Sequence, residues 1–111
     1  MKPIIEYDFA KKFNPYPGPR DESIGPHSGE KFKDEVLKKF FEEGQPILLN
    51  IDNTKVSFGP SFLSESFGLF AKEITLEKFN ELVKVKEDTP KGKKFKKKMM
   101  EYIQYELNND Q

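Results

Sequence analysis

A Gly-Pro turn joins a short apolar run to a phenylalanine-rich stretch in the segment Gln45–Phe70. The run Ile47–Ile51 is apolar except at one position, which is typical of a central parallel strand buried on most of both faces. Because proline suits the first position of a helix, a helix is predicted from about Pro60 to Lys72. A buried strand that leads directly into a helix favours an α/β fold.

Strand and helix patterns also precede this segment. Residues Lys2–Phe9 alternate in polarity and predict a short strand. Ser28 is a good N-cap for a following helix, and Gly44 is a good stop for it. The apolar face of that helix consists of Phe32, Val36, Leu37, Phe40 and Phe41.

The carboxyl-terminal part adds two helices and one strand. Thr75 caps a short helix that runs through Glu81, and the alternating segment Leu82–Lys86 predicts a third strand, with an extension of the helix as the alternative. The last helix spans about Pro90 to Asn108, with an apolar side chain at every fourth position. This element order predicts one domain over residues 1–111, with a mixed or mostly parallel sheet and helices packed against it.

Residues 13–29 differ in kind from the rest of the chain. They hold four of the eight prolines and three of the seven glycines. We therefore predict a long Gly/Pro loop without helix or strand. A loop of this length in a small domain is usually functional or mobile.

Composition excludes several classes of function. With no cysteine, the chain has no disulfide, thiolate catalyst or cysteine-ligated zinc. His27 is the only histidine, so neither a metal site nor a catalytic centre is expected, and no cofactor. No apolar run approaches the roughly 18 residues that span a bilayer, and the amino terminus lacks the apolar core of a signal peptide. We expect a cytoplasmic protein that is not an enzyme.

Six lysines crowd the start of the last helix. The net charge of the whole chain is zero, so this cluster is a local concentration of positive charge. It predicts attraction to nucleic acid, an anionic surface or an acidic protein face, with a solvated helix face as the alternative. The cluster consists of Lys91, Lys93, Lys94, Lys96, Lys97 and Lys98.

Three segments together resemble the STAS-like domains of unknown function, which are small prokaryotic domains distantly related to the anti-sigma-factor antagonists. They are Gly18-Pro-Arg20 with Gly25–Glu30, the strand ending in Asp52, and Ser61–Gly68. The resemblance covers roughly residues 2–108. It implies a small sandwich in which helices lie mainly on one side of a central sheet, and no characterised activity.

The resemblance also implies a partner and a site. In the antagonists, a kinase with a GHKL-type ATP-binding fold phosphorylates a serine at the start of the helix after a central strand, and Ser61 falls on that position. STAS-like domains often occur fused to or encoded beside GHKL-type ATPases, so such an ATPase or kinase is the expected protein partner. The antagonist pattern has other residues where this chain has Pro60, Phe62 and Leu63. Anion binding and helix capping therefore stay open for Ser61.

The other candidate residues for binding an anion or a partner lie around this site. Arg20 offers a guanidinium suited to phosphate or carboxylate, or a clamp on its own loop. Asp52 ends the central strand, where α/β sheets commonly bind ligands, although a turn residue is the alternative. A crevice formed by Arg20, His27 and Asp52 is a third hypothesis. The remaining candidates are the hydroxyls of Ser28, Ser57 and Ser64.

Overall fold

Three parallel strands form the centre of the molecule. The computed structural model describes residues 2–19 and 27–109. Within them, β1 (Ile5–Asp8), β2 (Ile47–Asn50) and β3 (Val83–Val85) pair in the order β1-β2-β3. Ile47 on the central strand pairs with Ile5 on one side and with Val83 on the other. The prediction of an α/β fold with a mostly parallel sheet is confirmed.

The helices form rods over this sheet. Two of the rods contain a π-helical segment, η1 or η2, between α-helical ends. The first runs through α2 (Gly29–Lys31), η1 (Phe32–Leu37) and α3 (Lys38–Glu43), and the second through α4 (Pro60–Leu63), η2 (Ser64–Gly68) and α5 (Leu69–Ile74). The others are α1 (Phe9–Lys12), α6 (Leu76–Leu82) and α7 (Pro90–Asn108).

Local capping chemistry places most helix ends where the sequence predicts them. The Ser28 hydroxyl accepts the N–H of Lys31 at 3.0 Å, and Gly44 ends α3 in the left-handed region at φ 65°. The Thr75 hydroxyl caps α6 by accepting the N–H of Lys78. Proline occupies the first turn of both α4 and α7. These signals act within a few residues and do not depend on the tertiary fold.

The first strand is shorter than predicted. It ends at Asp8, whose carboxylate accepts the N–H of Lys11 at 3.2 Å and so caps α1. Phe9 therefore begins a helix instead of continuing the strand, and its ring is fully buried. The sequence pattern does not reveal this change, because a buried apolar residue at position 9 fits both a continued strand and the start of a helix.

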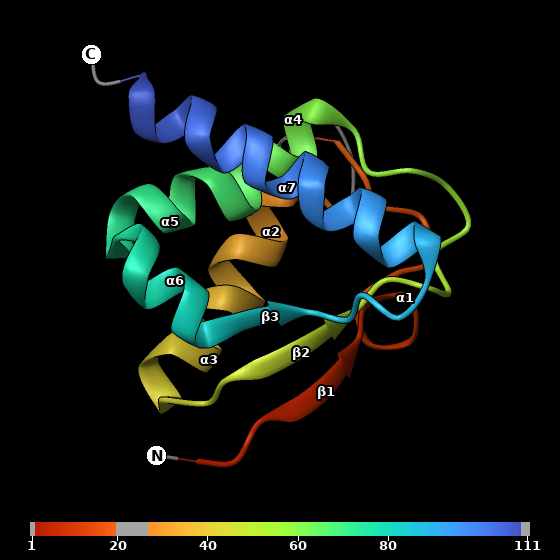
Figure 1. Cartoon of the computed structure of the whole chain (residues 1–111), viewed down its shortest axis with the longest axis horizontal. Coiled ribbons are helices and arrows are strands. Elements are labelled where there is room, and N and C mark those ends of the chain that lie inside the picture. Colours follow the sequence, from red (N-terminus) through yellow and green to blue (C-terminus); the bar gives the residue numbers. More distant parts are fainter. Residues whose placement is uncertain (1, 20–26, 110–111) are drawn as a thin grey trace.

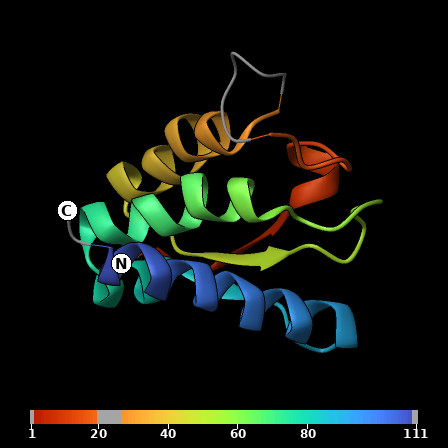
Figure 2. The same ribbon diagram turned by 90° about the horizontal axis from the view of Figure 1, so that it is seen from above.

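The helices cover one face of the sheet. In one pairing row Tyr7, Leu49 and Val85 are buried, whereas the adjacent row on the opposite face contains Leu48, which is half-buried, between two exposed charged residues. The expected burial of the central strand on both faces is therefore incomplete. Figure 1 shows the strands below α4, α5 and α7, and Figure 2 shows the α4–α5 rod between the α2–α3 rod and α7.

Phenylalanine rings fill the space between the sheet and the rods. The Phe9 ring lies within 6 Å, centroid to centroid, of rings from the first rod, the second rod and the loop before α4. The Phe95 ring of α7 continues the cluster through its contact with Phe58 at 4.7 Å. Six of the eleven phenylalanines are fully buried: Phe9, Phe32, Phe62, Phe67, Phe70 and Phe79.

Burial of Tyr7 makes stability depend on pH at the alkaline end. Only 5% of the side chain is exposed, and burial raises its pKa from the usual 10 to about 12. The unfolded chain therefore releases the phenolic proton at a lower pH than the folded protein. This contribution to stability is complete below about pH 10 and is lost as the pH rises to about 12. The free energy of unfolding lost in this way is at most about 3 kcal/mol.

Urea unfolding of the wild type and Tyr7→Phe at about pH 8 and about pH 11.5 measures this effect. The wild type should lose more unfolding free energy than the variant between the two pH values, because phenylalanine has no phenolic proton. Equal losses in the two proteins would contradict a raised pKa of Tyr7.

Candidate functional site

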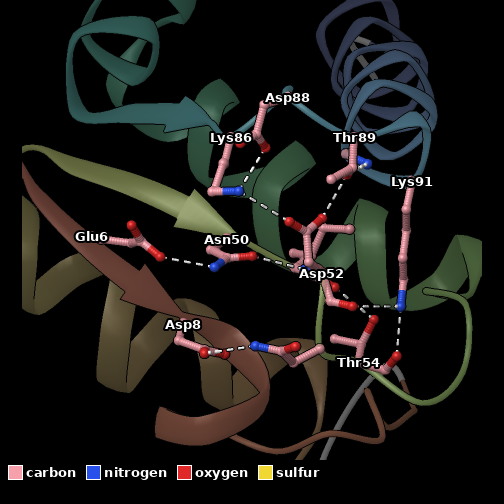
Figure 3. Close-up of polar contacts among 12 residues, drawn as sticks. Glu6, Asp8, Asn50, Asp52, Thr54, Lys86, Asp88, Thr89 and Lys91 are labelled. Atoms are coloured by element: carbon pink, nitrogen blue, oxygen red, sulfur yellow. Dashed lines mark hydrogen bonds and ion pairs between the residues drawn. The ribbon is translucent and has the colours of Figure 1, made fainter.

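The carboxyl ends of the three strands meet at one edge of the sheet, and a network of polar side chains covers this edge (Figure 3). Asp52, just after β2, lies at its centre. One carboxylate oxygen accepts the hydroxyl of Thr89 at 2.7 Å, and the other contacts the ammonium of Lys86 at 3.2 Å. Asp52 thus ties the end of β2 to the segment between β3 and α7.

Lys86 bridges two carboxylates in this network. Its ammonium lies 2.6 Å from a carboxylate oxygen of Asp88 and also contacts Asp52. The hydrogen bond from Lys86 holds the pKa of Asp88 below its usual value, and the bonds to Asp88 and Asp52 raise the pKa of Lys86. Both carboxylate oxygens of Asp52 are therefore engaged within the chain. Asp52 and Asn53 form the turn that the sequence predicts, in which the N–H of Thr54 donates to the carbonyl of Ile51 at 3.2 Å. The carboxylate of Asp52 makes its long-range contacts in addition to this turn.

Two amide side chains connect the same edge to β1. Asn50 donates to the carboxylate of Glu6 at 2.8 Å, and Asn53 donates to that of Asp8 at 3.0 Å. Asn50 also accepts the N–H of Asp52 at 2.9 Å. The edge where α/β sheets commonly bind ligands is therefore braced by contacts within this chain.

A groove opens beside this network, between the loop that follows Asp52 and the first half of α7. Its volume is about 340 Å³. The buried side chains of Phe58, Leu63 and Phe95 form its floor, while Val56 and Ser57 are the exposed members of its loop wall. We call it the lysine-rimmed groove, because Lys91, Lys94 and Lys98 form the opposite wall.

The structure thus divides the lysine cluster between two sides of α7. Lys91, Lys94 and Lys98 line the groove. Lys96 lies outside it and contacts a carboxylate oxygen of Glu87 at 3.1 Å. Lys93 and Lys97 are exposed and are not part of the groove. The groove therefore joins half of the predicted cluster to Ser57, whereas binding of nucleic acid by the cluster stays a prediction.

The candidate serines differ in accessibility. Ser57 and Ser61 are exposed, whereas Ser28 and Ser64 are buried. The capping alternative for Ser61 is wrong, because Gly59 occupies the N-cap of α4 and no side chain caps it. Ser61 presents its hydroxyl within the first turn of the α4–α5 rod, next to Pro60.

The crevice hypothesis gains no support. Arg20 lies outside the described residues. The His27 ring packs edge-on against Phe13 at 5.8 Å, and the carboxylate of Asp52 contacts Lys86 and Thr89. Across residues 2–19 and 27–109, no group of three or more His, Cys, Asp or Glu side chains is placed to hold a metal ion.

From the loop wall, the sequence analysis named Ser57 but not Val56, and it named no residue of the floor as part of a site. Val56 is 46% exposed although it is apolar, and it lies 38 residues before Lys94 in the chain. No local spacing connects these two positions. The one local sign of the groove was that Ser57 has an apolar residue on either side. The resemblance assigns this stretch no role beyond preceding the serine site.

Of the helices in the described part of the chain, none combines the length and the apolar character needed to cross a bilayer.

Comparison with known proteins identifies the family. The model of the STAS-like domain of unknown function (DUF4325) matches residues 28–99, which include β2, β3, Ser61 and the lysine cluster. No curated protein and no solved structure matched the chain. The match covers well over half of the 111 residues and confirms the resemblance seen in the sequence. The chain belongs to the family of STAS-like domains of unknown function.

Proposed function

We propose that this STAS-like domain is a non-enzymatic signalling module that docks a protein partner beside the start of the α4–α5 rod. The observation that carries the proposal is the exposed Ser61 hydroxyl in the first turn of that rod. Ser57 is exposed four residues earlier, and it lines the lysine-rimmed groove. A partner that covers this turn would therefore contact both a modifiable hydroxyl and a recessed surface.

Phosphorylation of Ser61 would regulate such docking. A phosphate adds about −1.5 to −2 charge at neutral pH, and the amino-terminal end of a helix favours negative charge. The described neighbours in the first turn of α4 include no acidic residue that would repel it. The modification would change the charge and shape of the docking surface without requiring the domain to unfold.

A GHKL-type ATPase or kinase is the partner class that we propose. Its support is the family relationship, since related antagonists are phosphorylated by such kinases at the corresponding helix start. The resemblance to the antagonists matches Ser61 to that position, and Ser61 is exposed.

Incubation with a GHKL-type ATPase encoded beside this domain, together with ATP, tests both parts of the proposal. We expect the two proteins to co-elute on a sizing column, and the intact mass of the domain to rise by one phosphate group. Ser61→Ala should abolish the mass change, whereas the matched control Ser57→Ala should retain it.

Two results would contradict the proposal in different ways. An unchanged mass with co-elution would remove the phosphorylation of Ser61 and keep the docking. Separate elution of the two proteins, with or without ATP, would remove the ATPase as the partner.

A further inference from the structure

The lysine-rimmed groove combines an apolar floor with a uniformly positive wall. Lys91, Lys94 and Lys98 recur at helical spacing on one side of α7. Among the described residues that line the groove there is no aspartate and no glutamate. The groove therefore presents three positive charges beside buried carbon surface, and the described part of its walls carries no opposing charge.

Within residues 2–19 and 27–109, no ion pair neutralises these charges. The ammonium of Lys91 donates to the backbone carbonyls of Asp52 and Thr54 at 3.1 and 2.6 Å, and carbonyls carry no formal charge. Lys94 and Lys98 form no ion pair with any residue of the described ranges. Lys91 is thereby held in position, while the other two ammonium groups are available to a ligand.

The loop wall favours an apolar anchor. Val56 is 46% exposed and lies at the groove, so its side chain offers apolar surface to a ligand there. A groove of about 340 Å³ has the size of a small ligand pocket, so it accommodates one bulky side chain of a peptide with its neighbours. Protein interfaces commonly bury such an anchor within a polar rim.

The aromatic floor does not suit stacked bases. Phe58 and Phe95 are each only 6% exposed, and their rings pack against one another at 4.7 Å. Neither ring offers an open face, and open aromatic faces are what proteins use to stack the bases of single-stranded nucleic acid.

We propose that the lysine-rimmed groove binds an acidic segment of a protein partner, with one bulky apolar side chain on the floor and flanking carboxylates on Lys94 and Lys98. This inference rests on the proposed docking function and names the chemistry of the partner segment. The positive rim attracts the carboxylates and fixes the register, and the apolar anchor provides the specificity.

A fluorescein-labelled peptide with a central tryptophan between glutamates is the probe, measured by fluorescence anisotropy at two salt concentrations. Lys94→Glu combined with Lys98→Glu should weaken binding at least about tenfold. The matched control is Lys93→Glu combined with Lys97→Glu, which makes the same charge change at the same spacing on the same helix but outside the groove. It should change binding by less than about threefold.

Val56→Asp tests the apolar wall separately. The side chain is exposed, so the variant should fold, and melting followed by circular dichroism checks this. We expect it to weaken binding of the probe by at least about tenfold, because it introduces a carboxylate among the flanking carboxylates. A second peptide with alanine in place of tryptophan should bind the wild type at least about tenfold more weakly.

Four outcomes would overturn the inference. They are absence of binding, equal weakening by the two lysine pairs, equal affinity for the tryptophan and alanine peptides, and tighter binding of single-stranded DNA of equal charge. The last outcome would assign the lysines to nucleic acid.

The same measurements separate this inference from the proposed function. If the wild type captures the ATPase and the Lys94→Glu, Lys98→Glu variant captures it equally well, the partner docks elsewhere and only the groove assignment fails. If the peptide binds in the groove but the ATPase does not bind, the groove assignment stands and the ATPase is not the partner.

Discussion

Replacing Phe32 with alanine should lower the free energy of unfolding by about 3–5 kcal/mol. The ring is fully buried, and removing it leaves a cavity where the first rod meets the sheet and the second rod. The cost is large because a cavity loses both the transfer free energy of the ring and its packing contacts. Five aromatic rings surround it at centroid distances of 5.0–6.1 Å: those of Tyr7, Phe9, Phe13, Phe62 and Phe67.

Urea unfolding measures the loss. Because a domain of this size has about 5–15 kcal/mol of stability in total, Phe32→Leu provides a milder variant that should cost less than the alanine variant and remain folded. The matched control is Phe41→Ala, since Phe41 is 37% exposed and should cost under about 2 kcal/mol. Similar losses for Phe32→Ala and Phe41→Ala would show that Phe32 is not at the centre of the core.

Gly92→Ala should destabilise the protein by about 2–3 kcal/mol. In an exposed helix the same change usually stabilises the fold, by as much as about 1 kcal/mol. Gly92 lies in the first turn of α7, where its N–H is accepted by Thr89. An added Cβ would collide with the backbone carbonyl oxygen of Lys86 and lie 3.3 Å from the Thr89 hydroxyl. Backbone cannot move aside as a flexible side chain can, so the start of α7 would have to shift.

Thermal and urea unfolding of Gly92→Ala and of Gly59→Ala provide the comparison. A Cβ at Gly59 meets nothing within 4 Å, so that variant should change stability by less than about 1 kcal/mol. Because Lys91 and Lys94 are on the same helix, Gly92→Ala should also weaken binding of the acidic peptide. A Gly92→Ala protein as stable as the wild type would show that α7 approaches Lys86 less closely.

The parts of the fold that could be predicted depend on short-range signals. The structure has the helix ends predicted at four residues. Ser28 acts through its hydroxyl, and Gly44, Pro60 and Pro90 act through their backbone conformation. The end of β1 could not be predicted, because the sequence around Asp8 is compatible with two structures. Asp8 can cap a helix that begins at Phe9, as it does in the structure, or Phe9 can continue the alternating pattern of the strand. The sequence analysis did not predict the π-helical segments η1 and η2.

The candidate site was predictable only in pieces. Ser57, Ser61 and the lysine cluster could be named from the sequence, since each is a local pattern. Their grouping could not, because Ser57 and Lys94 are brought to one groove by the packing of α7 on the second rod. The partners of Asp52 are equally remote, since Lys86 and Thr89 follow it by 34 and 37 residues.

The all-parallel sheet has a consequence for how the chain folds. Ile5 pairs with Ile47, and Ile47 pairs with Val83, so no strand has a partner within a tight turn. Non-local pairing slows folding, because the entropy of closing a long loop is lost before the strand contacts form. During synthesis on the ribosome, β1 therefore has no strand partner until β2 has left the exit tunnel, whereas α1 and the α2–α3 rod precede β2 in the chain and emerge before it.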